Sequence, residues 1–284
     1  MRDLTVRFRT GHGYVDAVKG ISLSVNAGRT LGIVGESGSG KSATCLSILG
    51  LHPHGTEVGG EIRFAGQDLL RLPEKALRGI RGKDIGLVYQ DPMAALNPVR
   101  PVGAQLREPL RVHLGMNRRQ ADERAAELLD RVGIASPRQQ LKAHPHQFSG
   151  GMRQRIVIAM ALACEPSLLL ADEPTTALDV SVQAQVLDLL RELSEELGIA
   201  LVLVSHDLSV VAGLADDVAV MYDGEVVENA PASRIFAHPE HEYTAALLAS
   251  VAPVDEDDAE WEPLPAADSA EVVPPVPDPS RSTP

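Results

Sequence analysis

The sequence predicts an α/β fold with a mainly parallel sheet buried between helices. Four short, nearly continuous apolar runs are typical of strands that are covered on both faces. Helix-like segments separate several of these runs, and alternating apolar and polar residues near the N-terminus indicate additional antiparallel strands. The four apolar runs cover residues 30–34, 85–89, 167–171 and 200–204.

The spacing of apolar residues also predicts the other strands and two helices. Apolar and polar residues alternate in residues 4–8 and 21–25, which predicts half-buried antiparallel strands, and residues 61–64 are expected to add another. Helices are predicted over Ser42–Leu51 and Val180–Leu197. Five apolar residues of the second helix fall on one face: Val182, Val186, Leu189, Leu190 and Leu193.

Residues 91–149 differ from the rest of the α/β pattern. Prolines interrupt the first part, and Arg118–Val132 then predicts a charged amphipathic helix. We interpret residues 91–149 as a helical subdomain inserted into a nucleotide-binding catalytic core that comprises residues 1–90 and 150–250. The interrupting prolines are Pro92, Pro98, Pro101 and Pro109.

The charge of the chain is concentrated near its C-terminus. The chain has 284 residues and a formal net charge of −13. Residues 253–284 hold nine acidic residues against one arginine, and eight of the 20 prolines follow Val251. We predict that residues 251–284 form a disordered, acidic, proline-rich tail. Such an acidic chain is a poor candidate for binding nucleic acid.

Three observations predict a soluble, cytoplasmic protein. The two cysteines, Cys45 and Cys164, lie among apolar residues and suggest a reducing compartment without disulfides. The first ten residues are too charged for the apolar part of a signal peptide. The longest apolar run, residues 156–164, is too short to span a bilayer. Any work at a membrane is therefore expected to go through partners.

A glycine-rich loop follows the first apolar run and opens the first predicted helix. Residues 35–42 fit the phosphate-binding pattern G-x-x-x-x-G-K-[ST] in the strand-to-helix context that this pattern requires. Such a loop points its backbone N–H groups at phosphate oxygens. We expect Lys41 to reach the β- and γ-phosphates of ATP and Ser42 to bind Mg²⁺. The predicted nucleotide contacts are Gly35, Glu36, Ser37, Gly38, Ser39, Gly40, Lys41, Ser42 and Thr44.

Residues suited to phosphoryl transfer also follow the other three apolar runs. Asp172 and Glu173 follow the third run, where a buried charge needs a partner such as Mg²⁺ or water. We expect Asp172 to hold the metal and Glu173 to act as general base on the attacking water. Gln90 and His206 follow the second and fourth runs. Because ligands bind at the carboxyl ends of parallel strands, Gln90 is predicted to coordinate Mg²⁺ and His206 to donate to the γ-phosphate.

A second anion site is predicted where Ser149, Gly150 and Gly151 precede another helix. The serine hydroxyl and the free N–H groups of the helix start suit a phosphate. The chain thus has two phosphate-binding helix starts but one set of Mg²⁺ and water residues. This mismatch predicts that the second site serves a nucleotide held by another subunit.

These motifs, with the turn at residues 177–179, occur in the order seen in ABC transporter ATPases, which the chain resembles over about residues 3–250. The resemblance implies a P-loop, RecA-like core with an antiparallel β subdomain and an inserted helical subdomain. It also implies that two such chains sandwich two ATP molecules. Ser149 and Gly151 would then contact the γ-phosphate held by the partner, and Asp179 would line the dimer interface.

The family also places an aromatic residue against adenine. Tyr14 is the best match by its distance from residues 17–20, and His12 stays open as an alternative. Phe8 is interpreted as a core residue of its strand.

Finer features resemble the ATPases of dipeptide and oligopeptide importers, whose relatives also carry nickel, glutathione and some oligosaccharides. Residues 89–98, 144–155 and 241–248 carry this resemblance, although Glu242 stands where the subfamily usually has proline. Some members hold an iron–sulfur cluster in a C-terminal segment with cysteines. Here that segment has no cysteine, and Cys45 and Cys164 cannot supply four ligands, so no iron–sulfur cluster is predicted.

The predicted function is ATP hydrolysis that energises import, with di- or oligopeptides as the cargo. The predicted partners are a second ATPase subunit (a related chain or a second copy), transmembrane permeases and an extracytoplasmic substrate-binding protein, without nucleic acid. They place the chain peripherally on the cytoplasmic face of the membrane. The predicted catalytic residues are Glu173, His206, Lys41 and Gln90.

Two other classes of function fit the sequence less well. ABC proteins of chromosome maintenance insert a long coiled coil between the phosphate loop and the signature, whereas here only 107 positions separate Ser42 from Ser149 and no heptads are sustained between them. ABC translation factors usually carry two ATPase units in one chain, and this chain has one. A catalytically silent partner subunit is disfavoured because the residues needed for catalysis are all present: Lys41, Asp172, Glu173 and His206. No residue names the cargo, since the ATPase subunit of this family does not touch it.

Overall fold

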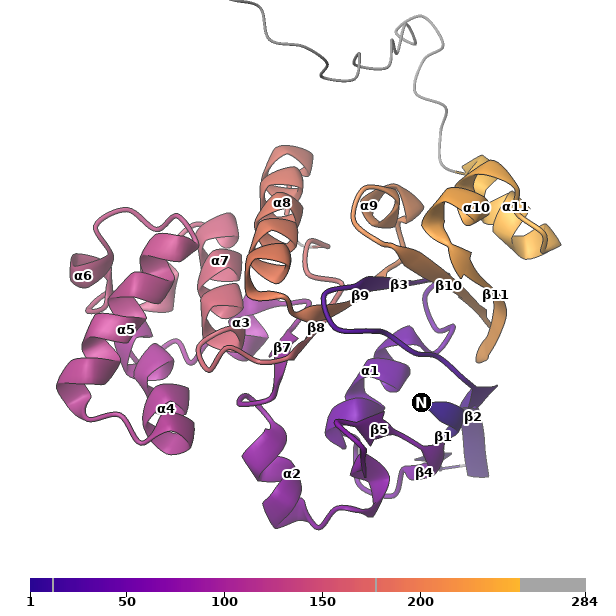
Figure 1. Ribbon diagram of the computed structural model, residues 1–284, viewed down its shortest axis with the longest axis horizontal. Helices are drawn as coiled ribbons and strands as arrows, with labels where there is room; N and C mark the ends of the chain where they lie inside the picture. Colours follow the sequence, from indigo (N-terminus) through magenta and orange to yellow (C-terminus); the bar gives the residue numbers. More distant parts are fainter. Residues whose placement is uncertain (12, 177, 251–284) are drawn as a thin grey trace, which may run out of the picture. The chain divides into compact units, whose positions relative to one another are not determined.

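The computed structural model describes residues 1–11, 13–176 and 178–250, and its centre is a six-stranded sheet (Figure 1). The strand order is β11-β10-β3-β9-β8-β7. Every neighbouring pair is parallel except β10 with β11. The four apolar runs are therefore confirmed as adjacent parallel strands. The strands are β3 (Thr30–Val34), β7 (Ile85–Val88), β8 (Leu168–Asp172), β9 (Ala200–Ser205), β10 (Asp217–Tyr222) and β11 (Glu225–Pro231).

A separate antiparallel sheet of order β2-β1-β4 lies on the α1 side of the central sheet (Figure 1). Its strands are β1 (Arg2–Thr10), β2 (Gly13–Ile21) and β4 (Glu57–Glu61), and β5 (Arg63–Phe64) pairs with β6 (Gln67–Asp68). The prediction of a strand over residues 21–25 was wrong, because β2 ends at Ile21. Leu23 is nevertheless buried, so the alternation there reports burial without strand pairing. The strand predicted over residues 61–64 is split between the end of β4 and β5.

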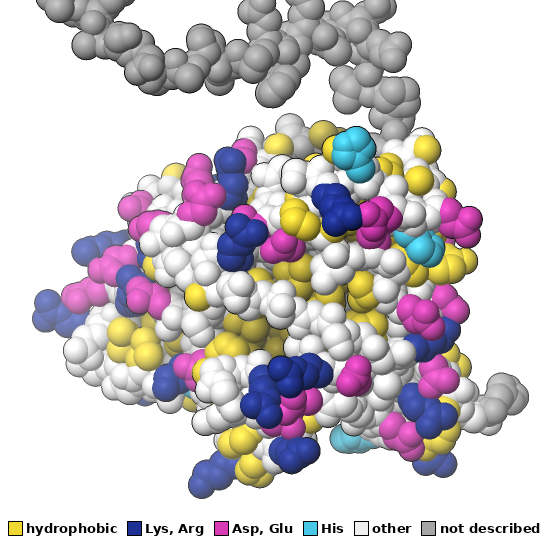
Figure 2. Space-filling model, turned by 45° about the vertical axis from the view of Figure 1, so that its right-hand side comes forward, with side chains coloured by type: hydrophobic (Ala, Val, Ile, Leu, Met, Phe, Trp, Pro, Cys, Tyr) yellow, Lys and Arg dark blue, Asp and Glu magenta, His cyan; other side chains and the backbone are white. Residues whose placement is uncertain are grey.

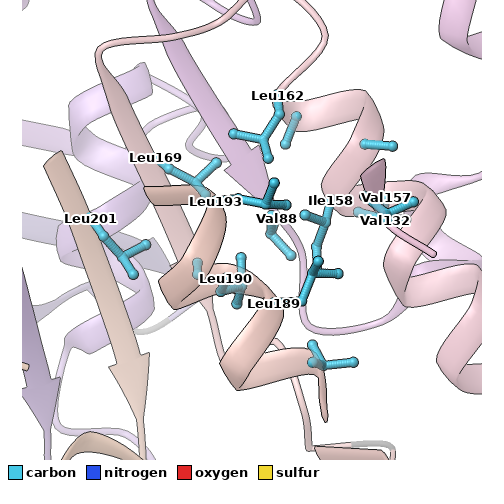
Figure 3. Packing of buried hydrophobic residues seen from close by; sticks show 14 of the residues in the cluster. Val88, Val132, Val157, Ile158, Leu162, Leu169, Leu189, Leu190, Leu193 and Leu201 are labelled. Carbon is cyan, nitrogen blue, oxygen red and sulfur yellow. The ribbon is translucent and has the colours of Figure 1, made fainter. Parts of the chain in front are cut away.

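The central sheet is buried on both faces, and alternate residues of a strand enter different clusters of apolar side chains. Leu168 and Leu170 of β8 join the cluster that contains Cys45 and Ile48 of α1. Leu169, between them, joins the cluster that contains residues of α7 and α8. Figure 3 shows this second side, where Leu169 and Leu201 of the sheet face Leu190 and its neighbours on α8. Two-sided burial explains why these strands are continuously apolar.

Two of the helices that pack on this sheet, α1 and α8, begin and end close to the predicted limits. α1 ends one residue before Gly50, whose left-handed backbone conformation caps it. α8 has the predicted bounds, and Asp179 caps its first turn. The helices are α1 (Lys41–Leu49), α7 (Gly150–Ala161), α8 (Val180–Leu197), α9 (Leu208–Ala212), α10 (Ala232–Ala237) and α11 (Glu242–Ser250).

Residues 91–149 contain helices and no strand, and they lie against α7 (Figure 1). The charged helix predicted from Arg118 is α5, which Asn117 and Gln120 cap reciprocally. Pro109 does not interrupt a helix as expected but lies inside α4. The helices are α3 (Pro92–Ala95), α4 (Val102–Leu114), α5 (Arg118–Arg131) and α6 (Pro137–Gln140), with a 3-10 turn at Pro145–Gln147; α2 (Glu74–Ile80) and another 3-10 turn at Leu69–Arg71 precede them.

The division into a core and a helical subdomain stays a prediction, and the predicted tail at residues 251–284 lies outside the described residues. Among the residues that the structure does describe, every helix is too short or too polar to cross a membrane.

Candidate functional site

The loop at residues 35–40 connects β3 to α1 and packs closely against the backbone of β2 and β10. Gly35 and Gly40 both have positive φ angles, 151° and 102°. A Cβ atom on Gly35 would lie 2.1 Å from the carbonyl oxygen of Met221, and one on Gly40 would lie 2.4 Å from that of Ala17. Only glycine fits these two positions, because a side chain would collide with the backbone of β10 or β2. The packing therefore sets the curvature of the loop.

Lys41 places a cation inside this loop. Its side chain is buried, and Nζ donates to the carbonyl oxygens of Gly35 at 2.7 Å and Glu36 at 2.8 Å. Burial lowers the pKa of Lys41, and the nearby carboxylates of Glu173 and Asp172 oppose this effect. Within the described part of the chain, Lys41 has no ion pair, and the buried hydroxyl of Ser39 has no hydrogen-bond partner. A cation and an unpaired hydroxyl in one loop fit an anionic ligand.

Ser42 and Asp172 meet beside the start of α1. The Ser42 hydroxyl donates to Asp172 Oδ1 over 2.9 Å. Burial raises the pKa of the Asp172 carboxyl, which the hydrogen bond from Ser42 partly offsets. No group of three or more His, Cys, Asp or Glu in the described ranges could hold a metal ion alone. The Ser42 hydroxyl and the Asp172 carboxylate thus suit an Mg²⁺ ion whose other ligands are phosphate oxygens and water.

Glu173 is the point where the ends of three strands converge. Its Oε2 accepts from Gln90 Nε2 at 3.1 Å and lies 3.3 Å from His206 Nδ1. Gln90 follows β7, Glu173 follows β8 and His206 follows β9. Glu173 is also one of the few non-glycine residues with a positive φ, 46°. Several contacts hold this strained backbone, as is common at functional sites.

Thr176 was missed by the sequence analysis. Its hydroxyl donates to Glu173 Oε2 over 2.9 Å, which makes it a further partner of that oxygen. The available signal was a hydroxyl residue three positions after Glu173 in the turn that Pro174 opens. Thr44 is fully buried, and its hydroxyl donates to the carbonyl oxygen of Gly40 in the loop; its contact with nucleotide stays a prediction.

The second predicted anion site is formed at the start of α7, with Asp179 at the start of α8. Ser149 caps α7, and its hydroxyl accepts from the N–H of Met152. A Cβ on Gly151 would lie 2.4 Å from Val182 Cγ1, so this glycine allows α7 to approach α8. Asp179 accepts from the N–H of Val182, and that bond holds the pKa of its carboxyl below the usual value. No hydrogen bond among the described residues joins Ser149, Gly150, Gly151 or Asp179 to residues 35–42.

Tyr14 lies on the exposed side of the antiparallel sheet. The pairing of β1 with β2 passes from Val6–Val18 to Arg7–Asp16, so Ala17 is passed over in a β-bulge. The bulge leaves Val18 buried and Tyr14 46% exposed. The guanidinium of Arg7 lies 5.2 Å from the centre of the Tyr14 ring. Phe8 packs against the buried cluster as expected, whereas His12 lies outside the described residues.

A glycine loop between a parallel strand and a helix, with a buried lysine and carboxylates at the end of a nearby strand, defines a P-loop nucleoside-triphosphate hydrolase. The comparisons with known proteins agree with this class. A family model described as "ABC transporter" matches residues 18–176. The chain belongs to the ABC transporter family and is an ATPase of that family.

Among curated proteins, the chain is 51% identical over 266 residues to the dipeptide transport ATP-binding protein DppD of Bacillus subtilis, covering 93% of this chain and 79% of that protein. It is 48% identical over 265 residues to the oligopeptide transport ATP-binding protein OppD of Salmonella typhimurium, with the same coverage. Among solved structures, the ATP-binding cassette MJ0796, a dimer bound to ADP and Pi, is 31% identical with a TM-score of 0.71. That match covers 81% of this chain and 97% of the cassette.

The geometry of the loop predicts different effects for two of its glycines. Gly38 and Gly40 both have positive φ angles, but a Cβ on Gly38 would meet nothing within 4 Å. Gly38→Ala should lower the free energy of unfolding by about 1–2 kcal/mol, the cost of a left-handed residue. Gly40→Ala should lower it further and weaken ATP binding, because its Cβ meets the Ala17 carbonyl. Urea unfolding and nucleotide titration of both variants check this, and equal losses would contradict it.

Proposed function

We propose that this chain is the ATP-hydrolysing subunit of an importer for di- or oligopeptides. The observation that carries ATP hydrolysis is the Glu173 carboxylate, held by Gln90, Thr176 and His206 beside the phosphate loop. Peptides are proposed as the cargo because relatives about half identical to this chain are named as dipeptide and oligopeptide transport ATP-binding proteins.

ATP binding is proposed to begin when Lys41 exchanges its hydrogen-bond acceptors. Its ammonium group donates to two loop carbonyls, and phosphate oxygens replace them when ATP enters. The N–H groups of residues 35–42 and the start of α1 surround the phosphates. Ser42, Asp172 and Gln90 are proposed to hold Mg²⁺, which when bound neutralises charge on the phosphate oxygens. Tyr14 offers adenine the ring face that Arg7 does not cover.

Hydrolysis is proposed to use Glu173 as the base. A water oxygen bonds to the γ-phosphorus, the bond from that phosphorus to the β–γ bridging oxygen breaks, and Glu173 takes a proton from the water. Its side chain is only 15% exposed, so a single orientation is maintained. Gln90 and Thr176 fix the carboxylate, and His206, whose Nδ1 lies 3.3 Å from it, is 52% exposed and is proposed to donate to the γ-phosphate.

A second ATPase subunit is proposed to complete the site. Ser149, Gly150 and Asp179 are exposed and make no hydrogen bond to residues 35–42 among the described residues, and the apolar side chain of Val180 is 84% exposed. A related chain or a second copy would cover them and receive Ser149 and Gly151 at its γ-phosphate. The other proposed partners are transmembrane permeases and a substrate-binding protein, with this chain peripheral on the cytoplasmic face. Lys and Arg are mixed with Asp and Glu on the face in Figure 2, which favours protein partners over nucleic acid.

Glu173→Gln tests the base. The variant should bind ATP within about twofold of wild type but lose at least about 100-fold in turnover, because Gln cannot accept the proton. The control is Glu165→Gln, since Glu165 also has a positive φ, 53°, but pairs with Arg124 on the surface. ATP titration and phosphate release measure both effects. Wild-type turnover in Glu173→Gln would remove Glu173 as base.

Tyr14→Ala tests adenine stacking. The dissociation constant for ATP should rise about tenfold, because stacking of a base on an aromatic ring contributes about 1–3 kcal/mol. Val15→Ala, at the neighbouring exposed position, should leave it unchanged. Both variants should bind inorganic triphosphate like wild type. Equal ATP affinities of the two variants would exclude Tyr14 from the adenine site.

The transport assignment is tested by isolating the Glu173→Gln chain from its native membranes with ATP and identifying bound proteins by mass spectrometry. Two permeases, a second ATPase and a substrate-binding protein are expected, and peptides should bind that last protein. The same isolation with Lys41→Ala should lose the ATP-dependent second ATPase. Recovery of ribosomal or nucleic-acid-binding proteins alone would reject import while leaving ATP hydrolysis intact.

A further inference from the structure

A tyrosine from the last described helix reaches the phosphate loop. The hydroxyl oxygen of Tyr243, in α11, accepts the backbone N–H of Glu36 over 3.1 Å. Glu36 is the second residue of the loop, and 207 positions separate it from Tyr243. None of the proposed steps uses Tyr243. This contact therefore needs its own explanation.

The peptide unit of Glu36 is held from two directions. Lys41 Nζ donates to its carbonyl oxygen, while Tyr243 accepts from its N–H. The backbone N–H of Gly224, in the turn between β10 and β11, donates to the carbonyl oxygen of Ser39 over 3.2 Å. Chain segments beyond β10 thus bind the loop at two points. When Lys41 turns to phosphate, the bond that Glu36 donates to Tyr243 and the bond that Gly224 donates to Ser39 still tie the loop to the segment after β10.

Two contacts fix the position of Tyr243. Its ring packs on that of Tyr222, with 4.4 Å between the ring centres. The Glu228 carboxylate on β11 accepts the N–H groups of Glu240 at 3.0 Å and His241 at 3.1 Å, just before α11. Partial burial opposes the charge of Glu228, but the Thr244 hydroxyl and these two N–H groups together keep the pKa of its carboxyl below the usual value, so it remains charged near neutral pH. A charged acceptor therefore anchors the start of the helix that carries Tyr243.

We propose that Tyr243 is a positioning residue for the phosphate loop and that α11 is part of the nucleotide site. The hydroxyl holds the Glu36 peptide in the orientation that the loop needs when Lys41 leaves its carbonyl. This inference rests on the proposed ATP-binding function and extends it to a segment outside the P-loop motifs. Its consequence is that the C-terminal helix sets the affinity for nucleotide without touching the reacting atoms.

Tyr243→Phe removes only the hydroxyl and leaves the ring contact. The dissociation constant for ATP should rise about threefold to tenfold, because one hydrogen bond is lost and a backbone N–H is left unpaired. The value of kcat at saturating ATP should stay within about twofold of wild type. Tyr222→Phe is the matched control, since the Tyr222 hydroxyl has no hydrogen-bond partner in the described part of the chain. An unchanged affinity in Tyr243→Phe, or an equal loss in Tyr222→Phe, would overturn the proposal.

A second variant tests whether Glu228, by anchoring the start of α11, supports the contact of Tyr243 with the loop. Glu228→Ala should weaken ATP binding in the same direction, whereas Glu225→Ala, at an exposed position on the same strand, should not. The double variant Glu228→Ala/Tyr243→Phe should bind ATP within about twofold of the weaker single variant, because both changes break one connection. If the double variant raises the dissociation constant by the product of the two single effects, Glu228 and Tyr243 act independently and the connection is contradicted.

The same titrations separate this inference from the proposed function. If wild-type chain binds no ATP, the proposed function fails. If wild type binds ATP, Lys41→Ala does not, and Tyr243→Phe matches wild type, only the role of Tyr243 fails. Thermal unfolding of each variant shows whether a loss of affinity comes from a general loss of stability.

Discussion

The parallel pairing of β7, β8 and β9 is the constraint on which the candidate site depends. Parallel strands end at the same edge of the sheet, and here the pairing of Asp172 with Val204 fixes how far each strand runs. Glu173 then turns with a positive φ, and its N–H donates to the Val204 carbonyl. A shift of one residue in this register would turn the side chains at this strand end to the opposite face of the sheet. The register thus brings Gln90 and His206 to the same oxygen.

The second determinant is the close approach of backbone segments behind the phosphate loop. The carbonyl groups of Ala17 and Met221 occupy the space that side chains at Gly40 and Gly35 would need. The β-bulge at Ala17 turns β2 at that point, and the turn after β10 donates to the loop at Ser39. The loop is consequently shaped before any ligand arrives. Because the N–H donors are already in position, binding avoids the loss of conformational entropy that ordering a flexible loop would require.

These contacts connect parts of the chain that are far apart in sequence. β2 touches the loop on one side, and the segment from β10 to α11 touches it on another. The exposed residues Ser149, Gly150 and Asp179 point instead to a second subunit, because nothing in the described part of this chain brings them to the loop. One chain therefore supplies a preformed phosphate loop and a general base, together with an exposed surface that suits the nucleotide site of a second subunit.

Sequence alone determined the features that local rules control. Residues 35–42 specify a phosphate loop because glycine conformation and helix geometry act over a few residues. The four apolar runs specify buried strands, and the residues that follow three of them are the predicted site residues Gln90, Asp172, Glu173 and His206. The end of β2 was misplaced, since alternation at Leu23 records burial and not pairing. Pro109 inside α4 was unexpected because tertiary packing offsets one missing helical hydrogen bond.

Only the tertiary structure decided which side chains meet. The strand order, the hydrogen bond of Thr176 to Glu173 and that of Glu36 to Tyr243 all join atoms whose approach depends on packing across the whole fold. Sequence periodicity fixes the face on which a residue lies but carries no distance between elements. Long-range contacts of this kind therefore become visible only when the sheet and its helices are assembled.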